Sequence, residues 1–279
     1  MAPILEVSDE VYQALCKLGT KHTLLPNQEA PKPTEIRFEP KLADYLMLER
    51  KEGAPLLVGK YRLSAEPAVK EAGKRIGLSL QDTAQERNGR NYAGNMNREQ
   101  ALKLNLLLGG KTANVGISRD YFRLLLSGKA FDGESKRARQ SELSAILDEI
   151  IGVREPWRAE WFEDGFSGES KQLTLNRDYE LKGGVLTPKY AEPLQPCLME
   201  DRIPGISFKD WMKCASAQGF PLANVKSGDL YSWAPKANSV AGFYAYSAGA
   251  DLDCSRLPVN SYPSLGVRHV REAHGASEK

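Results

Sequence analysis

The chain has 279 residues, of which 27% are charged and 41% hydrophobic, and its formal net charge is +2. This balance is that of a globular protein, and the charge is too small to predict a nucleic-acid-binding surface. No apolar run reaches the roughly 18 residues of a membrane span, and no leader peptide is expected at the N-terminus. The four cysteines, Cys16, Cys197, Cys214 and Cys254, lie far apart, so neither a CxxC motif nor a dense disulfide framework is predicted, and their pairing stays open.

The first third of the chain is expected to hold short elements joined by polar loops. In chain order the patterns predict a strand at 3–8, a helix at 10–18, an edge strand at 35–40, a helix at 41–51, a strand at 55–63 and a short helix at 68–76. The rest of the polar stretch 64–97 is expected to be loop. A boundary is therefore placed near residue 90, between an N-terminal portion, 1–90, whose role stays open and which is free to pack onto the rest, and a main domain, 91–279.

The main domain opens with a clearly marked helix. Asn97 is a good N-cap for it, because its side chain can accept from the backbone N–H of Gln100, and Gly109-Gly110 ends it. The adjoining GGKT sequence is not expected to bind phosphate, since Asn105 stands where a P-loop needs glycine and a helix precedes the motif. Further helices are predicted at 119–127, 141–151 and 208–217, a hairpin of strands at 172–179 and 184–190, and a strand at 230–233.

Large aromatic residues are concentrated in the sequence GVREPWRAEWFEDGF, residues 152–166. Trp157, Trp161, Phe162 and Phe166 are predicted to anchor the core, with the neighbouring Arg and Glu side chains paired at its rim. A sugar-stacking platform is the alternative that the sequence leaves open.

The C-terminal stretch 237–271, which we call the tail, has an unusual composition. Its 35 residues include no Lys, Glu, Gln, Met or Trp, whereas the composition of the whole chain predicts about seven. The tail is instead rich in residues that binding loops use: Tyr gives stiff amphipathic contact, and Ser, Gly and Asn give adaptable hydrogen bonds.

Two segments of the tail alternate with the period of a β-strand. In the first, Phe243 and Ala245 fall on one face, and Tyr244 and Tyr246 on the other. In the second, Leu252 and Cys254 share a face, and the opposite face carries Asp251, Asp253, Ser255 and Leu257. A turn then shows Val259, Asn260 and Tyr262, and a closing strand follows at 265–271. The tail is thus predicted to display every second side chain for contact; an ordinary hairpin with a mixed exposed face is the alternative.

The region from about Asn97 onward resembles the C-terminal variable region of archaeal diversity-generating retroelement variable proteins of the Nanoarchaeota type. The resemblance is most specific in FYAYSAGADLDCSRLPVNSYPSLGVRHVREA and extends to IGVREPWRAEW and SVAGFYA. In such systems a reverse transcriptase copies a template and randomises its adenines, so AAY codons become NNY codons. NNY codons cannot encode Lys, Glu, Gln, Met or Trp, and these are the residue types missing from the tail.

The resemblance implies an α+β, C-type-lectin-like fold, with a mixed, mostly antiparallel sheet flanked by helices. It implies a binding protein, not an enzyme, that displays a hypervariable surface to a variable protein or glycoconjugate partner on another cell or a virus. The positions implied to vary are Tyr244, Tyr246, Ala248, Gly249, Asp251, Asp253, Ser255, Leu257, Val259, Asn260 and Tyr262. Implied scaffold positions are Phe243, Leu252, Cys254, Leu265, Gly266 and Val267, with Trp157, Trp161, Trp211 and Trp233 in the core.

The sequence departs from two classes with related folds. Calcium-dependent sugar-binding lectins carry an EPN or QPD triplet and a WND triplet, which this chain lacks, so neither calcium nor another cofactor is expected. Formylglycine-generating enzymes need a reactive cysteine pair near the C-terminus, whereas Cys254 stands alone in that region.

Two alternative functions remain. A viral tail-fibre or adhesion component would share the binding role and differ in assembly. An enzyme finds little support, because the three histidines, His22, His269 and His274, lack metal-ligand spacing and no GxSxG motif is present. The one catalytic arrangement considered is a cleft shared by Asp251, Asp253 and His269. No membrane insertion is expected, and the location stays open: surface display or secretion would use a route other than a leader.

Overall fold

The computed structural model describes residues 36–169, 172–246 and 248–273, so the strand predicted at 3–8 and the helix at 10–18 lie outside the described residues. The chain divides at residue 35, and the described residues belong to the compact unit that begins at Ile36. No division falls near residue 90. Strand β2 (Leu56–Arg62) pairs with the C-terminal strand β14 (Arg268–Glu272), so residues on both sides of that expected boundary share one sheet.

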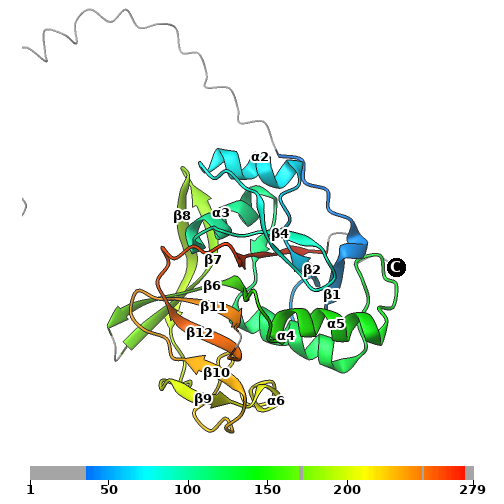
Figure 1. Cartoon of the computed structure of the whole chain (residues 1–279). Coiled ribbons are helices and arrows are strands. Elements are labelled where there is room, and N and C mark those ends of the chain that lie inside the picture. The colour runs from blue at the N-terminus through cyan, green and yellow to red at the C-terminus, as the bar shows by residue number, and fades with distance from the viewer. Residues whose placement is uncertain (1–35, 170–171, 247, 274–279) are drawn as a thin grey trace, which may run out of the picture. The chain divides into compact units, whose positions relative to one another are not determined.

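The fold is α+β, and its described strands form three sheets that are mostly antiparallel (Figure 1). A four-stranded sheet has the order β1-β2-β14-β5, with β1 at Tyr45–Leu48 and β5 at Lys111–Thr112. The strands β3 (Asp82–Gln85) and β4 (Asn91–Ala93) form a separate pair. In Figure 1 the red C-terminal strand β14 lies beside the blue β2. The two ends of the described chain thus meet in one sheet.

The large sheet has the order β8-β7-β6-β11-β12-β10-β9, and the two-residue strand β13 (Leu265–Gly266) pairs with β6. Its strands are β6 (Arg158–Glu169), β7 (Gln172–Lys182), β8 (Val185–Pro193), β9 (Arg202–Ile206), β10 (Leu230–Trp233), β11 (Val240–Ala245) and β12 (Ala250–Arg256). The predicted hairpin and the predicted strands at β10, β11 and β12 are confirmed. Gly183 and Gly184 join β7 to β8 with φ angles of 58° and 81°, which suit glycine in a tight hairpin turn.

The helices are α2 (Pro67–Arg75), α3 (Arg98–Leu107), α4 (Val115–Ser127), α5 (Gln140–Ile151) and α6 (Phe208–Trp211), with a short 3₁₀ turn η1 (Leu42–Asp44). The predicted cap of α3 is confirmed: Asn97 Oδ1 accepts from the Gln100 backbone N–H, and Gln100 Oε1 accepts from the Asn97 N–H, each at 2.9 Å. Helix α4 begins earlier than predicted, because Asn114 caps it by accepting from the Ile117 N–H at 2.8 Å. Gly128 ends it with a φ of 67°.

Four local predictions are wrong. The stretch 64–97 was expected to be loop outside one short helix, but it also holds the paired strands β3 and β4. Residues 41–51 form η1 and β1 instead of a helix, because β1 pairs with β2 and buries Leu46 and Leu48. Tertiary pairing here overrides helix propensity. No strand forms at 36–40. Helix α6 stops at Trp211 instead of 217, and Ala215 forms a β-bridge with Pro221.

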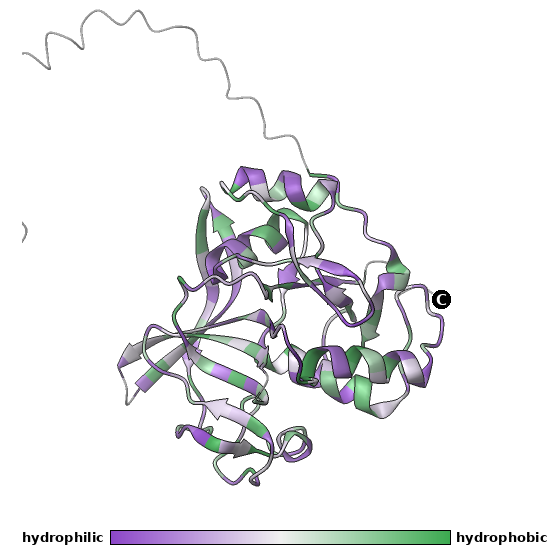
Figure 2. Ribbon diagram, viewed as in Figure 1, coloured by the Kyte–Doolittle hydropathy of each residue, from purple (hydrophilic) through white to green (hydrophobic). Residues whose placement is uncertain are grey.

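The large sheet separates two hydrophobic clusters. Neighbouring residues of β11 point to opposite faces, so Phe243 belongs to the first cluster and Tyr244 to the second. The first cluster includes Leu252, Cys254 and residues of α4 and α5; the second includes Trp161, Val267 and residues of α2 and α3. In Figure 2 apolar and polar residues alternate along these helices, as expected where one side faces a core. The implied scaffold positions are all buried, as are Trp161 and Trp211.

A set of buried charged side chains joins the two larger sheets, and we call it the ionic cluster. It consists of Arg62, Glu86, Glu149, Arg158, Glu160 and Arg268. Arg268 Nε lies 3.1 Å from Glu160 Oε2, and Arg158 Nε lies 2.8 Å from Glu149 Oε1. Arg62 contacts Glu149, Glu86 and Glu160 at 3.6, 3.7 and 3.8 Å. The prediction that the charges of 152–166 lie at the rim is therefore wrong for Arg158 and Glu160, because β2, β14 and α5 bring partners to them inside the protein.

Candidate functional site

The tail strands meet the large sheet in a register that gathers polar and aromatic side chains on one face. β11 pairs antiparallel with β12, which sets Tyr244 opposite Asp251. β10 pairs parallel with the other edge of β12, which sets Tyr231 opposite Asp251 and Trp233 opposite Asp253. Side chains directly opposite one another in a sheet share a face. This face is therefore built from segments that the sequence separates by turns and loops.

A cavity of about 510 Å³ opens on this face, and we call it the tail cavity. It is lined by seven of the positions expected to vary: Tyr246, Ala248, Asp251, Asp253, Ser255, Leu257 and Asn260. Its volume is within the range of small-ligand sites. The structure thus brings together most of the positions that the resemblance selected.

Four lining residues were missed as site residues: Ile203, Tyr231, Trp233 and Arg256. Trp233 was assigned to the core but is half-buried at the cavity wall. Tyr231 and Trp233 alternate with Leu230 and Ser232, which are buried, and this alternation was the available signal. Nothing local marks Ile203, because only the pairing of β9 with β10 brings it to the cavity.

Several positions expected to be displayed are buried: Tyr244, Gly249, Asp251 and Asp253. The alternation of residues along a strand predicts which side chains share a face of the sheet, whereas the exposure of those side chains depends on what packs over that face. The β11 part of the face lies under the second hydrophobic cluster, which includes Tyr244. A Cβ at Gly249 would lie 2.5 Å from a ring carbon of Tyr231, so any other residue there must displace that ring.

The remaining tail positions are accessible. Leu257 and Val259 are 60% and 73% exposed, Tyr262 is 38% exposed, and Ala248 is exposed. Ile203, 55% exposed, lies with Leu257 at the mouth of the tail cavity. Exposed apolar side chains grouped at a cavity mouth are a feature of binding surfaces.

An aromatic group flanks the tail cavity. The rings of Tyr244 and Tyr246 stack with centroids 5.6 Å apart, and Trp157 lies 5.3 Å from Tyr246. Tyr262 meets Trp157 edge-on at 5.5 Å. Trp157 was predicted to be core but is only half-buried, because it packs beside the tail tyrosines at the margin of the second cluster.

The two carboxylates of the tail cavity have different surroundings. Asp253 is fully paired: Arg256 Nε lies 2.6 Å from its Oδ2, and the Ser255 N–H and Oγ–H donate to its Oδ1 at 2.8 and 2.9 Å. Asp251 receives one hydrogen bond, from Trp233 Nε1 to Oδ2 at 3.2 Å. Its Oδ1 is buried and has no hydrogen-bond partner among the residues that the structure describes. Burial, with the nearby charge of Asp253, raises the pKa of Asp251 to about 8.

Arg256 is held on three sides. Besides Asp253, it donates to Tyr246 Oη, and its guanidinium lies 4.4 Å from the centroid of the Tyr244 ring. Its charge is therefore already balanced within the protein. Among the carboxylate oxygens that line the tail cavity, Asp251 Oδ1 is the one without a hydrogen-bond partner in the described chain, and a buried acceptor beside a cavity marks a candidate site.

The catalytic cleft considered from the sequence does not form. His269 lies on β14 in the four-stranded sheet, where its Nδ1 is 2.9 Å from Tyr45 Oη, and it lines a different cavity from Asp251 and Asp253. Burial lowers the pKa of His269 to about 3. Among residues 36–169, 172–246 and 248–273, no group of three or more His, Cys, Asp or Glu side chains is placed to hold a metal ion.

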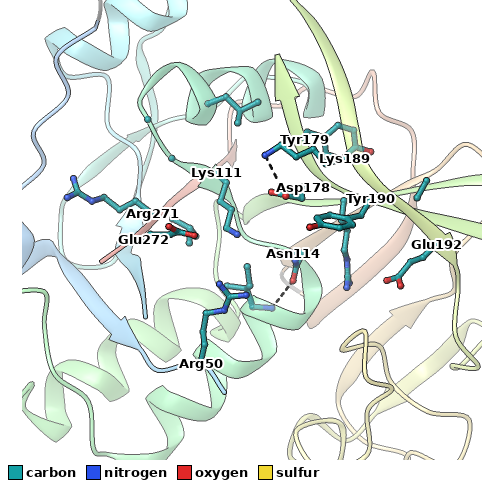
Figure 3. Close-up of a pocket in the computed structure, with 17 residues that line it drawn as sticks. Arg50, Lys111, Asn114, Asp178, Tyr179, Lys189, Tyr190, Glu192, Arg271 and Glu272 are labelled. Atoms are coloured by element: carbon teal, nitrogen blue, oxygen red, sulfur yellow. Dashed lines mark hydrogen bonds and ion pairs between the residues drawn. The ribbon is translucent and has the colours of Figure 1, made fainter. Parts of the chain in front are cut away.

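A larger cavity, about 700 Å³, lies elsewhere and is shown in Figure 3. Its charged lining residues are Arg50, Lys111, Arg177, Asp178, Lys189, Glu192, Arg271 and Glu272. In Figure 3 Lys189 reaches toward Asp178, and their charged atoms are 3.7 Å apart. None of the positions expected to vary lines this cavity, and none of its lining residues carries a buried polar atom that lacks a partner within the described chain. The tail cavity is therefore the candidate site, although it is smaller.

Comparison with known protein families, with curated proteins and with solved structures finds no match for this chain. No helix in the described part of the chain is long and apolar enough to cross a membrane. The functional interpretation therefore rests on the composition of the tail and on the geometry of the tail cavity.

Proposed function

We propose that this protein is a diversified ligand-binding protein with a C-type-lectin-like fold, whose tail is rewritten by adenine-directed retroelement mutagenesis. Its task is to bind a variable protein or glycoconjugate partner, and not to catalyse a reaction. One observation carries the proposal. Seven positions expected to vary converge on one cavity, while the implied scaffold positions are buried, all except Gly266 within the two hydrophobic clusters.

The arrangement divides the tail into positions that can change at little cost and positions that cannot. Exposed substitutions usually alter the free energy of unfolding by no more than about 0.5 kcal/mol, and Ala248, Leu257 and Val259 are exposed. Tyr244 is fully buried, and Gly249 is confined by Tyr231. We therefore expect functional diversity at the cavity mouth and the loop after β12, with a more restricted floor.

A library tests this division. Single positions are randomised with NNY codons in the full-length chain, displayed on yeast, and sorted for resistance to protease before sequencing. Broad tolerance is expected at Ala248, Leu257, Val259 and Asn260, and narrow tolerance at Tyr244 and Gly249. Phe243 and Leu252, buried on the other face, are the matched controls. If the four mouth and loop positions are as restricted as Phe243 and Leu252, the display function is wrong.

The origin of the diversity has its own test. Sequencing of the DNA around the gene is expected to show a near-copy of the tail's coding segment, differing chiefly at adenines, beside a reverse transcriptase gene. Natural isolates should then differ at the mouth and loop positions and agree at Phe243, Leu252 and Cys254. A locus with neither feature would remove the retroelement from the proposal, even if the library shows that the surface tolerates change.

A further inference from the structure

We infer that the tail cavity, as written in this sequence, receives a basic side chain, Lys or Arg, of a protein partner, which passes between aromatic walls and ends on Asp251. This rests on the proposed function in one respect: it takes the tail cavity as the binding site. It adds the chemical class of the ligand, which neither the composition of the tail nor the resemblance supplies.

The walls of the cavity suit a cation on an aliphatic stem. Tyr231, Trp233 and Tyr246 line it, and aromatic faces attract ammonium and guanidinium groups. Ile203 and Leu257 lie at its mouth, where apolar side chains can pack against the methylene groups of Lys or Arg. Asp251 is 3% exposed, whereas Ile203 and Leu257 are 55% and 60% exposed, so the charged head would lie deeper than the stem.

The floor supplies an acceptor that the described part of the chain does not use. Asp253 is balanced by Arg256 and Ser255, and Arg256 is in turn held by Asp253 and Tyr246. Asp251 Oδ1 has no partner in the described chain although the residue is only 3% exposed. A buried acceptor of this kind costs free energy until a donor reaches it, and a basic side chain brings both a donor and the opposite charge.

Among the residues that the structure describes, the groups around Asp251 include no free cation. On its own strand lie Asp253 and the paired Arg256. Tyr244 of β11 and Tyr246, just after β11, lie on one side of it, and Tyr231 and Trp233 of β10 lie on the other. Because burial and Asp253 raise its pKa to about 8, the carboxyl is mostly protonated at neutral pH in the free protein. A cationic ligand favours the ionised form, so binding should release a proton. A neutral ligand would leave the proton in place.

The test uses the full-length protein and three small probes: the Nα-acetyl methylamides of lysine, of arginine and of norleucine, the last lacking the charge. Binding is followed by NMR through the indole Nε1–H of Trp233, which is identified with Trp233→Phe. The lysine or arginine probe is expected to bind about tenfold or more tightly than the norleucine probe. Its affinity should rise roughly fiftyfold from pH 6 to pH 8, as the ionised fraction of a group with a pKa of about 8 increases.

Asp251→Asn should abolish the preference for the charged probes and the pH dependence. Asp178→Asn is the matched control: it removes a carboxylate from the larger cavity, at a φ of 49° that asparagine tolerates. It should leave binding unchanged. The pH series on the unaltered protein needs no variant, so the inference stays testable if Asp251→Asn does not fold.

The inference is overturned if the norleucine probe binds as tightly as the lysine and arginine probes, or if affinity for the charged probes does not rise between pH 6 and pH 8. Preference for a neutral sugar over all three probes would equally overturn it. The two proposals fail separately. If the mouth and loop positions tolerate substitution but the charged probes do not bind, only the inferred class of ligand is wrong. If the charged probes bind but those positions do not tolerate substitution, only the proposed display function is wrong.

Discussion

The ionic cluster and the tail cavity both bury titratable side chains, and they differ in whether each carboxylate has a cation beside it. Within the described residues both regions contain atoms without a hydrogen-bond partner, such as Glu86 Oε2 and Asp251 Oδ1. In the ionic cluster every carboxylate faces a guanidinium: Glu160 faces Arg268, Glu149 faces Arg158, and Glu86 faces Arg62. In the tail cavity Asp253 is paired in the same way, but Asp251 keeps an oxygen without a partner in the described chain.

The difference follows from position. The ionic cluster lies where β2, β6, β14 and α5 meet, so each charge can find a partner on another element. Removing a charge there uncovers its partner in a low-dielectric interior. Asp251 is only 3% exposed but lines the tail cavity, and its Oδ1 meets no donor among the described residues. Burial therefore pairs each carboxylate with a guanidinium in one region, and in the other it leaves the carboxyl oxygen on which the inferred basic ligand depends.

The largest effect is expected from breaking the ionic cluster. Arg62→Met leaves Glu86, Glu149 and Glu160 without one of their cations, and the free energy of unfolding should fall by about 3–5 kcal/mol. Denaturation by urea measures it. The control, Arg123→Met, removes an exposed arginine that pairs with Asp120, and it should change stability by less than about 1 kcal/mol. If Arg62→Met and Arg123→Met both lower the free energy of unfolding by less than about 1 kcal/mol, the ionic cluster does not hold the sheets together.

Substitution of Tyr244 tests whether the buried tail residues beside the tail cavity belong to the hydrophobic core. Tyr244→Ala removes a fully buried ring that stacks on Tyr246 and lies under Arg256, and it should cost about 3 kcal/mol. Tyr262→Ala, at a ring that is 38% exposed, should cost about 1 kcal/mol or less. Thermal and urea denaturation of both variants give the comparison. A Tyr244 variant as stable as the Tyr262 variant would contradict the buried floor.

The unpaired carboxyl should appear in the pH dependence of stability. The pKa of Asp251 is raised from 3.8 to about 8 on folding, so the folded state holds its proton more tightly. The resulting stability is fully present below pH 3.8 and is lost as pH rises toward 8, by up to about 1.4 kcal/mol per pH unit. Urea denaturation between pH 5 and 8 should show a shallower decline for Asp251→Asn than for the unaltered protein. Identical slopes would contradict the raised pKa.

The smallest effect is expected at the loop after β12. Val259 is 73% exposed, so Val259→Asn should change the free energy of unfolding by no more than about 0.5 kcal/mol. The same denaturation assay measures it, with Val267→Asn, at a fully buried position, as the destabilised reference. A loss at Val259 comparable to that at Val267 would show that the loop is part of the core.

Local patterns predicted a good part of the fold. The cap at Asn97, the glycine turn between β7 and β8 and the alternation in β11 and β12 are properties of short segments, and the structure contains each of them. Errors arose where distant pairing decides the outcome. Within residues 41–51, Tyr45–Leu48 form a strand because β2 is available to pair, and the charges of β6 are buried because β2, β14 and α5 supply partners.

For the candidate site, the sequence by itself determined which tail residues share a face, because alternation is a property of any β-strand. It also determined the composition of the tail, including the residue types that are missing. Only the tertiary structure decided which of those residues are accessible. Tyr244 is covered and Leu257 is exposed because burial depends on what packs over a face. Likewise Trp233 reached Asp251 through the parallel pairing of β10 with β12, and no local pattern encodes which strands become neighbours.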